Sequence, residues 1–437
     1  MRALLLLLFL ALLLPACGGA EADGPTTLRF WAFGREGEVV QELMRDFERE
    51  NPDVRVRVQQ IPWTAAHEKL LTAFVGDATP DLAQLGNTWI AEFTTLDALQ
   101  PLDAYVARSR VVDPERFFPG IWATNVVDGQ VYGIPWYVDT RVIYYRTDLL
   151  RQAGYDSVPK TWEEWREAMR AVKRELGPER YAIFLPVNEW AQPVIFGMQA
   201  GSPLLKDDAQ YGAFGEPAFA RGFDFYLSLF REGLAPEMSN TQVANLYQEF
   251  AAGTFAMYIS GPWNVGEFSS RLPAELQDDW STAPLPGPDG PGVSMAGGAS
   301  LVVFRASAHK QAAWRVVEYL ARPESQRRFN ELSGNLPANR IAWQDSALLG
   351  DRRLRAFWQQ LQRVVPLPKV PESEAIAIRV QEIAETAILG RATPAQALRR
   401  LDADVNAMLE KRRWMLARET ERADAGAPGA ASTRGQP

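Results

Sequence analysis

The chain has 437 residues, of which 47% are hydrophobic and 23% are charged. This length exceeds what one hydrophobic core usually supports and predicts two lobes, while the composition is that of a globular protein and excludes a disordered or fibrous one. The formal net charge of −8 argues against nucleic acid or an anionic membrane surface as a partner, because both select basic proteins.

The N-terminus carries export signals. Arg2 precedes an apolar run at residues 3–14, which is too short to span a bilayer and is typical of a signal peptide. The following Leu14-Pro15-Ala16-Cys17 resembles a bacterial lipobox, and Cys17 is the only cysteine of the chain. We therefore expect a signal peptide over 1–16, lipidation of Cys17, a tether over 17–25, and a protein exported to the cell envelope and anchored there. The alternative is an ordinary cleaved signal with an incidental cysteine. No later stretch of the sequence is apolar enough to predict a membrane span.

Strands and helices are predicted to alternate after the tether. Apolar residues recur with helical spacing at 39–47 and 65–74, and strands are expected at 27–32, 54–58 and 81–85. This β-α-β-α-β order predicts a parallel sheet with helices on its faces.

Two further segments read as connections between lobes. Residues 131–145 are aromatic and β-rich, with Pro135 interrupting a continuous ladder, and the Pro- and Gly-rich loop at 284–292 precedes a strand at 301–304. We expect the chain to cross between the lobes at the first segment and to return at the second.

Two capping signals mark the starts of later helices. Thr161 with Glu164 predicts a helix to about Leu176, and Thr393 with Gln396 predicts a long helix towards Trp414. The composition then becomes rich in Ala, Gly, Pro, Ser and Thr, and a disordered tail is expected over 417–437.

Eight short segments, in order along the chain, carry a resemblance to a known family. They are 28–31, 79–82, 132–136 with 144–150, 159–164, 250–257, 260–263, 297–298 and 389–398. Together they resemble the extracellular solute-binding proteins of carbohydrate ABC importers, the group that contains the maltodextrin-binding proteins.

The resemblance implies an α/β, periplasmic-binding-protein-like fold with two discontinuous lobes joined by hinge strands. The expected lobes are 26–136 with 293–340, and 137–292 with 341–416. A small sugar would bind in the cleft between them, and a membrane permease would receive it. Neither an enzymatic activity nor a cofactor is implied, and a monomer is expected.

Sugar binding requires aromatic planes that stack on the ring and polar groups that bond its hydroxyls. Ligand sites in open α/β sheets lie beyond the carboxyl ends of strands, where several such side chains occur. The candidate ligand-binding residues are Phe33, Arg35 and Glu36 after the first strand; Asn87 and Trp89 after the third; Tyr137, Asp139 and Arg141 on one face of the crossing strand; Glu189 and Trp190 after a strand at 181–185; Trp263 and Asn264; the backbone of Gly297 and Gly298; and Arg379.

Structural roles are the alternative for most of these residues. Arg35 with Glu36 would form a surface charge pair, Asp139 with Arg141 a structural ion pair, and Gly297 with Gly298 a hinge. Trp263 is the strongest candidate, because the resemblance matches it to a stacking tryptophan of the family. The family often has another aromatic near Ile376, and its absence here favours a mono- or disaccharide.

Other functions remain open at this point. A glycosidase would need two carboxylates, for which Asp139 and Glu189 are available without a supporting motif. A receptor for a polyamine or for glycerol phosphate is the nearer alternative, and a phosphate would be expected to enlist Arg35, Arg141 and Arg379 together. The two histidines, His67 and His309, stand apart from other ligand types, so no metal site is expected.

Overall fold

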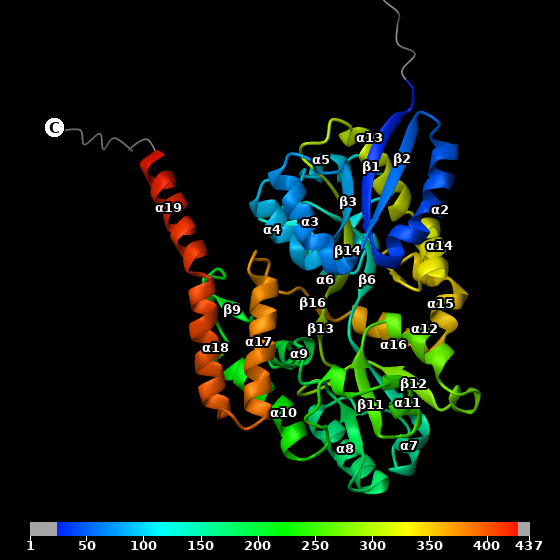
Figure 1. Ribbon diagram of the computed structural model, residues 1–437, viewed down its shortest axis with the longest axis vertical. Coiled ribbons are helices and arrows are strands. Elements are labelled where there is room, and N and C mark those ends of the chain that lie inside the picture. The colour runs from blue at the N-terminus through cyan, green and yellow to red at the C-terminus, as the bar shows by residue number, and fades with distance from the viewer. Residues whose placement is uncertain (1–23, 427–437) are drawn as a thin grey trace, which may run out of the picture.

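The computed structural model describes residues 24–426, and the side chains as far as Arg418. The expected signal peptide, the lipidation site Cys17 and most of the tether lie outside the described residues. The described chain forms two α/β lobes, one above the other in Figure 1.

The N-terminal lobe is built on a six-stranded sheet. Its first three strands pair in parallel, as predicted, while three later strands join it through antiparallel pairs. The order across the sheet is β15 (Leu336–Pro337), β6 (Ile134–Asp139), β14 (Gly297–Val303), β3 (Leu82–Gly86), β1 (Thr26–Phe33) and β2 (Val54–Ile61). Helices that cover it include α2 (Gly34–Glu50), α3 (Trp63–Val75), α13 (Lys310–Ala321) and α14 (Pro323–Ser333).

The C-terminal lobe has a four-stranded sheet and a larger set of helices. The strand order is β12 (Trp280–Ala283), β7 (Val142–Arg146), β11 (Phe255–Ser260) and β8 (Tyr181–Phe184). Its longer helices are α8 (Trp162–Leu176), α9 (Ala191–Gln199), α10 (Pro217–Arg231), α12 (Trp263–Arg271), α16 (Arg352–Leu361), α17 (Ser373–Ile388) and α18 (Pro394–Met408).

Both faces of the central strands are buried, which explains the long apolar runs of the sequence. In β1, Leu28 and Phe30 pack into one apolar cluster, and Trp31 and Phe33 pack into another on the opposite face. Side chains of a strand point alternately to its two faces, so a strand covered on both sides loses the polar alternation of a half-exposed one.

Segments from three parts of the chain meet between the lobes. β6 belongs to the upper sheet and β7 to the lower one, so the chain crosses at Thr140 and Arg141. The Thr140 hydroxyl donates to the carbonyl oxygen of Met295 at 2.9 Å, which ties this crossing to the returning strand β13 (Ser294–Met295). β13 in turn pairs with β16 (Val364–Val365). The predicted two-lobed, discontinuous architecture with hinge strands is confirmed.

The C-terminal end differs from the expectation. The long helix expected after Thr393 breaks at Leu409, and a second helix, α19 (Glu410–Gly426), extends away from the lobe (Figure 1). The tail expected to be disordered from 417 onward is therefore helical through Gly426, because that stretch still contains several good helix formers. Within residues 24–426, no helix is long and apolar enough to cross a membrane.

Candidate functional site

A cleft of about 340 Å³ lies where the two lobes face each other. Its walls come from strand ends and helix starts of both lobes. The lining residues are Glu36, Trp63, Gly86, Asn87, Thr88, Trp89, Tyr137, Asp139, Arg141, Trp190, Pro262, Trp263, Met295, Gly297, Gly298, Asn335 and Glu374.

Two tryptophans of the N-terminal lobe form an aromatic wall over a buried phenylalanine. The ring centroids of Trp63 and Trp89 lie 5.7 Å apart, and Phe33 packs beneath them at 5.1 and 6.0 Å. Gly34 permits this arrangement: it adopts φ +51°, and a Cβ there would lie 2.8 Å from Cδ1 of Trp63. The wall is thus fixed from behind, leaving Trp63 36% exposed.

Glu36 is held at the same wall by two donors. Its carboxylate accepts hydrogen bonds from Nε1 of Trp63 at 3.3 Å and from Nδ2 of Asn335 at 3.0 Å. The side chain lies in the first turn of α2, where the helix dipole favours an anion, and the residue is 8% exposed. Glu36 is therefore a fixed hydrogen-bond acceptor at the cleft.

Tyr137 contributes a neutral hydroxyl next to these groups. Gln84 donates to its phenol oxygen at 2.9 Å. Burial, together with the negative charges of Glu36 and Asp139, holds the pKa of Tyr137 well above its ordinary value. The phenol therefore keeps its proton at neutral pH and remains a donor.

Asp139 and Arg141 form an ion pair that faces the cleft. Nη1 of Arg141 lies 2.5 Å from Oδ1 of Asp139, and the guanidinium carbon lies 4.7 Å from the ring centroid of Trp263. Burial raises the pKa of Asp139, while the charge and hydrogen bond of Arg141 act in the opposite direction. Asp139 and Arg141 can therefore form this ion pair and still contact a ligand, since both side chains line the cleft.

Trp263 stands at the start of α12 in the C-terminal lobe and is 48% exposed. Its ring folds back over Gly261, where a Cβ would lie 2.0 Å from the ring, so only glycine fits there. The hydroxyl of Tyr144 donates to the carbonyl oxygen of Gly261 at 2.6 Å and fixes this turn.

Direct hydrogen bonds join the two lobes at one rim of the cleft. Oγ1 of Thr88 donates to Oε1 of Glu374, on α17, at 2.6 Å. Nearby, Nζ of Lys369 donates to the carbonyl oxygen of Val126 at 2.5 Å. The lobes are therefore in contact on this side.

Comparison with known proteins places this architecture in a family. A family model described as bacterial extracellular solute-binding protein matches residues 33–327. The chain belongs to this family. The predicted relationship to these receptors is thereby confirmed.

Solved and curated relatives extend the match over most of the chain. The structure of the sugar-binding protein MalE from Xanthomonas citri is similar at 50% identity and a TM-score of 0.88, covering 90% of this chain and 99% of that one. An uncharacterized lipoprotein of Streptomyces antibioticus is 29% identical over 364 residues, which are 79% of this chain and 78% of the relative. The diacetylchitobiose binding protein DasA of Streptomyces coelicolor is 25% identical over 412 residues, covering 90% and 95%.

Ten of the expected site residues line the cleft of this solute-binding protein. Sequence reasoning placed them at strand ends or at the crossing, and those places converge here. They are Glu36, Asn87, Trp89, Tyr137, Asp139, Arg141, Trp190, Trp263, Gly297 and Gly298.

Three expected residues lie beside the cleft rather than in it. Phe33 is fully buried and supports the tryptophan wall from below. Asn264 is buried and bonds the hydroxyls of Tyr247 and Ser260, because the start of α12 turns it inward. Arg35 points to solvent and pairs with a glutamate one helical turn further on, so the surface alternative holds for it.

Glu189 and Arg379 also lie outside the cleft. Glu189 accepts from the backbone N–H of Ala191 at 3.2 Å at the start of α9, and does not line the cleft. Arg379 lies on α17 but turns away to pair with Asp404.

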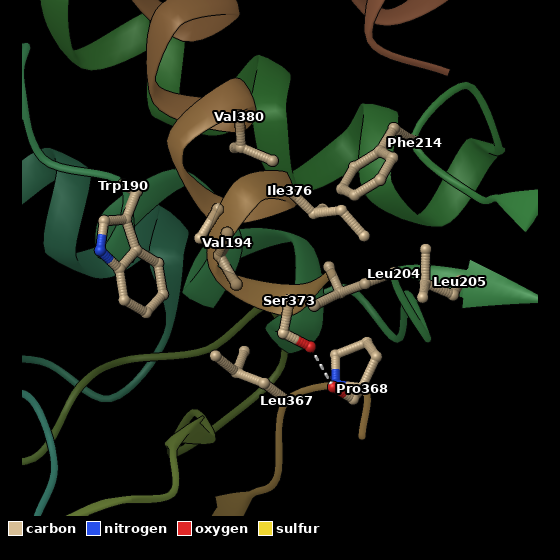
Figure 2. Close-up of a pocket in the computed structure, with 11 residues that line it drawn as sticks. Trp190, Val194, Leu204, Leu205, Phe214, Leu367, Pro368, Ser373, Ile376 and Val380 are labelled. Carbon is tan, nitrogen blue, oxygen red and sulfur yellow. Dashed lines mark hydrogen bonds between the residues drawn. The ribbon is translucent and has the colours of Figure 1, made fainter. Parts of the chain in front are cut away.

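Ile376, at the position where the family often has an aromatic residue, does not line the cleft either. Ile376 lines a small apolar pocket of about 20 Å³ (Figure 2), and Trp190 lines both this pocket and the cleft. The residue that α17 presents to the cleft is instead Glu374.

Four lining residues that carry side-chain chemistry were not predicted. Trp63 follows Ile61 at the end of β2, so the strand-end rule applied to that strand would have found it. Thr88 lies between two predicted residues. Asn335 and Glu374 reach the cleft from distant segments, and no local pattern marks them. Among the described residues, no group of His, Cys, Asp or Glu is arranged to hold a metal ion.

Proposed function

We propose that the chain is an exported, lipid-anchored receptor that binds a neutral sugar of mono- or disaccharide size in the interlobe cleft and delivers it to an ABC importer. The observation that carries the proposal is the make-up of the cleft. Three tryptophans, Trp63, Trp89 and Trp263, come from opposite walls and combine with fixed polar groups between them.

This combination suits the chemistry of a sugar. The apolar face of a pyranose packs on an aromatic ring, while its hydroxyls bond planar polar groups. Glu36 and Asp139 supply charged acceptors, and Asn87 and Arg141 supply donors. Hydrogen bonds to charged groups contribute about 1.5–3 kcal/mol each, so a few of them account for specific binding.

The charge balance of the cleft argues against an anionic ligand. It contains three carboxylates, from Glu36, Asp139 and Glu374, and one cation, Arg141. A phosphate ligand was expected to enlist three arginines, but Arg35 and Arg379 lie outside the cleft. Glycerol phosphate is therefore disfavoured.

A polyamine is the stronger of the non-sugar alternatives. Arg141 neutralises Asp139, whereas Glu36 is bonded only by the neutral donors of Trp63 and Asn335, and Glu374 by the hydroxyl of Thr88. Two carboxylates of the cleft therefore keep an uncompensated charge. Binding of spermidine without binding of any sugar would support this alternative.

The size of the cleft supports a small sugar. Its volume of about 340 Å³ is near the lower end of the range of about 300–1,000 Å³ found for small-molecule sites. Ile376 adds no aromatic surface along α17. Both features favour one or two sugar units over a long chain.

Binding would be coupled to closure of the lobes about the hinge strands. A ligand shifts such an equilibrium only by its differential affinity for the open and closed forms. Groups on both walls provide that difference, because a sugar between them contacts all of them only when the lobes are shut. The closed receptor would then dock on the permease.

The lipid anchor is proposed from Cys17 and from the similarity to the lipoprotein of Streptomyces antibioticus. Replacing Cys17 by Ala should move the protein from the membrane fraction to the soluble envelope fraction. Retention of the variant in the membrane would contradict the anchor.

The alternative to a receptor is an enzyme that cleaves glycosides. Its two expected carboxylates do not converge, because Glu189 lies outside the cleft. Titration of a saccharide panel by Trp fluorescence, with product analysis of the same samples, separates the two functions. A fluorescence change without cleavage supports the receptor, and release of a cleaved product supports the enzyme.

A further inference from the structure

The C-terminal lobe has a second hollow that shares no residue with the cleft. It measures about 640 Å³ and lies between helix α16, strand β12 and the loop at 157–160. Tyr145, Arg363 and residues 284–285 and 291 complete its lining. Figure 1 shows α16 and β12 side by side in the lower lobe.

The charged residues that line this hollow are all cations. They are Lys160 on one side and Arg352, Arg355 and Arg363 on the other, and no carboxylate lines it. Such an assembly is unusual in a chain whose formal net charge is −8. Like charges around one space repel each other, so their grouping raises the positive potential there and favours an anion.

Three of the four cations have no counter-ion within the described part of the chain. Arg352 approaches Asp278 at 3.4 Å, and Asp278 is almost fully exposed. For Lys160, Arg355 and Arg363, no side-chain hydrogen bond or ion pair is formed with the described residues. Their donors are therefore available to a ligand.

Two of the arginines lie on one face of α16, and a third follows the end of the helix. Arg352, Arg355, Ala356 and Gln359 follow helical spacing within α16, whereas Arg363 lies in the short segment between α16 and β16. Arg352 occupies the first turn of α16, where the helix dipole disfavours a cation, and its guanidinium donates to the carbonyl oxygen of Gln277 at 3.1 Å.

The separation of the cations favours an extended ligand. Arg352 begins α16 and Arg363 follows its end, and the ten residues of this helix span about 15 Å at the rise of an α-helix. One phosphate group cannot reach both ends. The buried side chains of Val158, Leu285 and Ala356 also line the hollow and offer apolar surface to a linker between charged groups.

We propose that this basic hollow is a binding site for a polyanion that carries at least two phosphate groups, either free in solution or in the headgroup of an anionic lipid. The site is separate from the sugar cleft and does not depend on the proposed function. Through this site, a receptor with a negative net charge can bind a ligand that carries several phosphate groups.

Calorimetric titration of the purified protein with tripolyphosphate tests this site. The wild type should bind at low salt, with affinity falling as salt is raised. The double variant Arg355→Gln/Arg363→Gln should bind roughly tenfold or more weakly, because two charged hydrogen-bonding groups are lost. The control Arg108→Gln/Arg399→Gln removes the same charge from two exposed sites elsewhere and should bind as the wild type does.

Two results would overturn the proposal: no binding of tripolyphosphate at low salt, or equal weakening in both double variants. Thermal unfolding of each variant, matched to the wild type, ensures that a loss reflects the site and not the fold. Sedimentation with phosphatidylcholine vesicles, with and without cardiolipin, then distinguishes the sources. Cardiolipin-dependent sedimentation that the site variant loses assigns a lipid headgroup. Tripolyphosphate binding without sedimentation assigns a soluble ligand.

Discussion

The two walls of the cleft are built differently. On the N-terminal lobe, Trp63 and Trp89 rest on a buried phenylalanine, and Glu36 is tied to Trp63 and Asn335. On the C-terminal lobe, Trp263 stands 48% exposed, with the Arg141 guanidinium as its cation-π neighbour. One wall is held by several mutual contacts, and the other by few.

This difference suggests an order of events in binding. A preorganised wall loses little conformational entropy when ligand arrives, so it contributes more of its interaction energy to affinity. A less supported wall becomes ordered as the lobes close. We therefore expect sugar to bind first to the N-terminal lobe and Trp263 to complete the site.

The largest expected effect comes from breaking the preorganised wall. Glu36→Ala removes a charged acceptor and leaves the donors of Trp63 and Asn335 unpaired. Sugar affinity measured by calorimetry should fall by about 3 kcal/mol, more than a hundredfold. The melting temperature of the ligand-free protein should fall as well.

Glu38→Ala is the matched control on the same helix. Glu38 is exposed and pairs with Arg35 at 3.0 Å, so its loss should change affinity and stability little, as expected for a surface ion pair. Equal effects of the two substitutions would contradict the special role of Glu36.

Removing the opposite wall should affect binding without affecting the ligand-free fold. Trp263→Ala should weaken sugar binding by about 2 kcal/mol, as expected for a stacking anchor. Because the side chain is half exposed, the melting temperature without ligand should change little. Trp414→Ala, at another exposed tryptophan on α19, should leave both quantities unchanged. A large loss of ligand-free stability in Trp263→Ala would contradict the claim that this wall is held by fewer contacts than the opposite one.

An ion pair that does not line the cleft stabilises the C-terminal lobe. Arg146 donates to both carboxylate oxygens of Asp148, at 2.8 and 2.6 Å, and its own side chain is buried. Asp148→Asn should therefore lower the free energy of unfolding by about 2 kcal/mol at pH 7. Sugar affinity should be retained, because neither residue lines the cleft.

The contribution of Asp148 to the free energy of unfolding should depend on pH. Burial raises the pKa of Asp148, but the hydrogen bonds and charge of Arg146 outweigh it, and the pKa lies below its ordinary value. The ionised group thus stabilises the fold above the ordinary aspartate pKa of about 3.9, and this contribution is lost as the pH falls through the lowered value. Denaturant unfolding should show the difference between wild type and variant shrinking in acid. A constant difference would contradict the assignment.

The smallest effect is expected at the rim where the lobes meet. Thr88→Val removes the hydroxyl that donates to Glu374 and should shift the lobes towards the open form by about 1 kcal/mol. Small-angle scattering should report a larger radius of gyration without ligand. Thr386→Val, whose hydroxyl bonds within α17, is the control and should not open the lobes.

Local patterns predicted much of the fold. The alternation and helical spacing of the first 85 residues correspond to β1, α2, β2, α3 and β3, and Thr161 and Thr393 cap helices as expected. These features depend on neighbours along the chain, so the sequence contains them directly.

Side-chain direction near the cleft was harder to predict. Trp190 rather than Glu189 lines it, and Glu374 rather than Arg379, because the phase of a helix start decides which neighbour points inward. Asn335 arrives from a segment far along the chain, and only the assembled sheet brings it to Glu36. Long-range packing, which has no local signature, determined these positions.

Calorimetric titration of the wild type and of Trp263→Ala with a panel of mono- and disaccharides tests the central claim most directly. We predict that at least one sugar binds the wild type and that the variant binds the same sugar about thirtyfold more weakly. If no sugar of the panel bound, or if the variant bound it with wild-type affinity, carbohydrate recognition between the two walls would be contradicted.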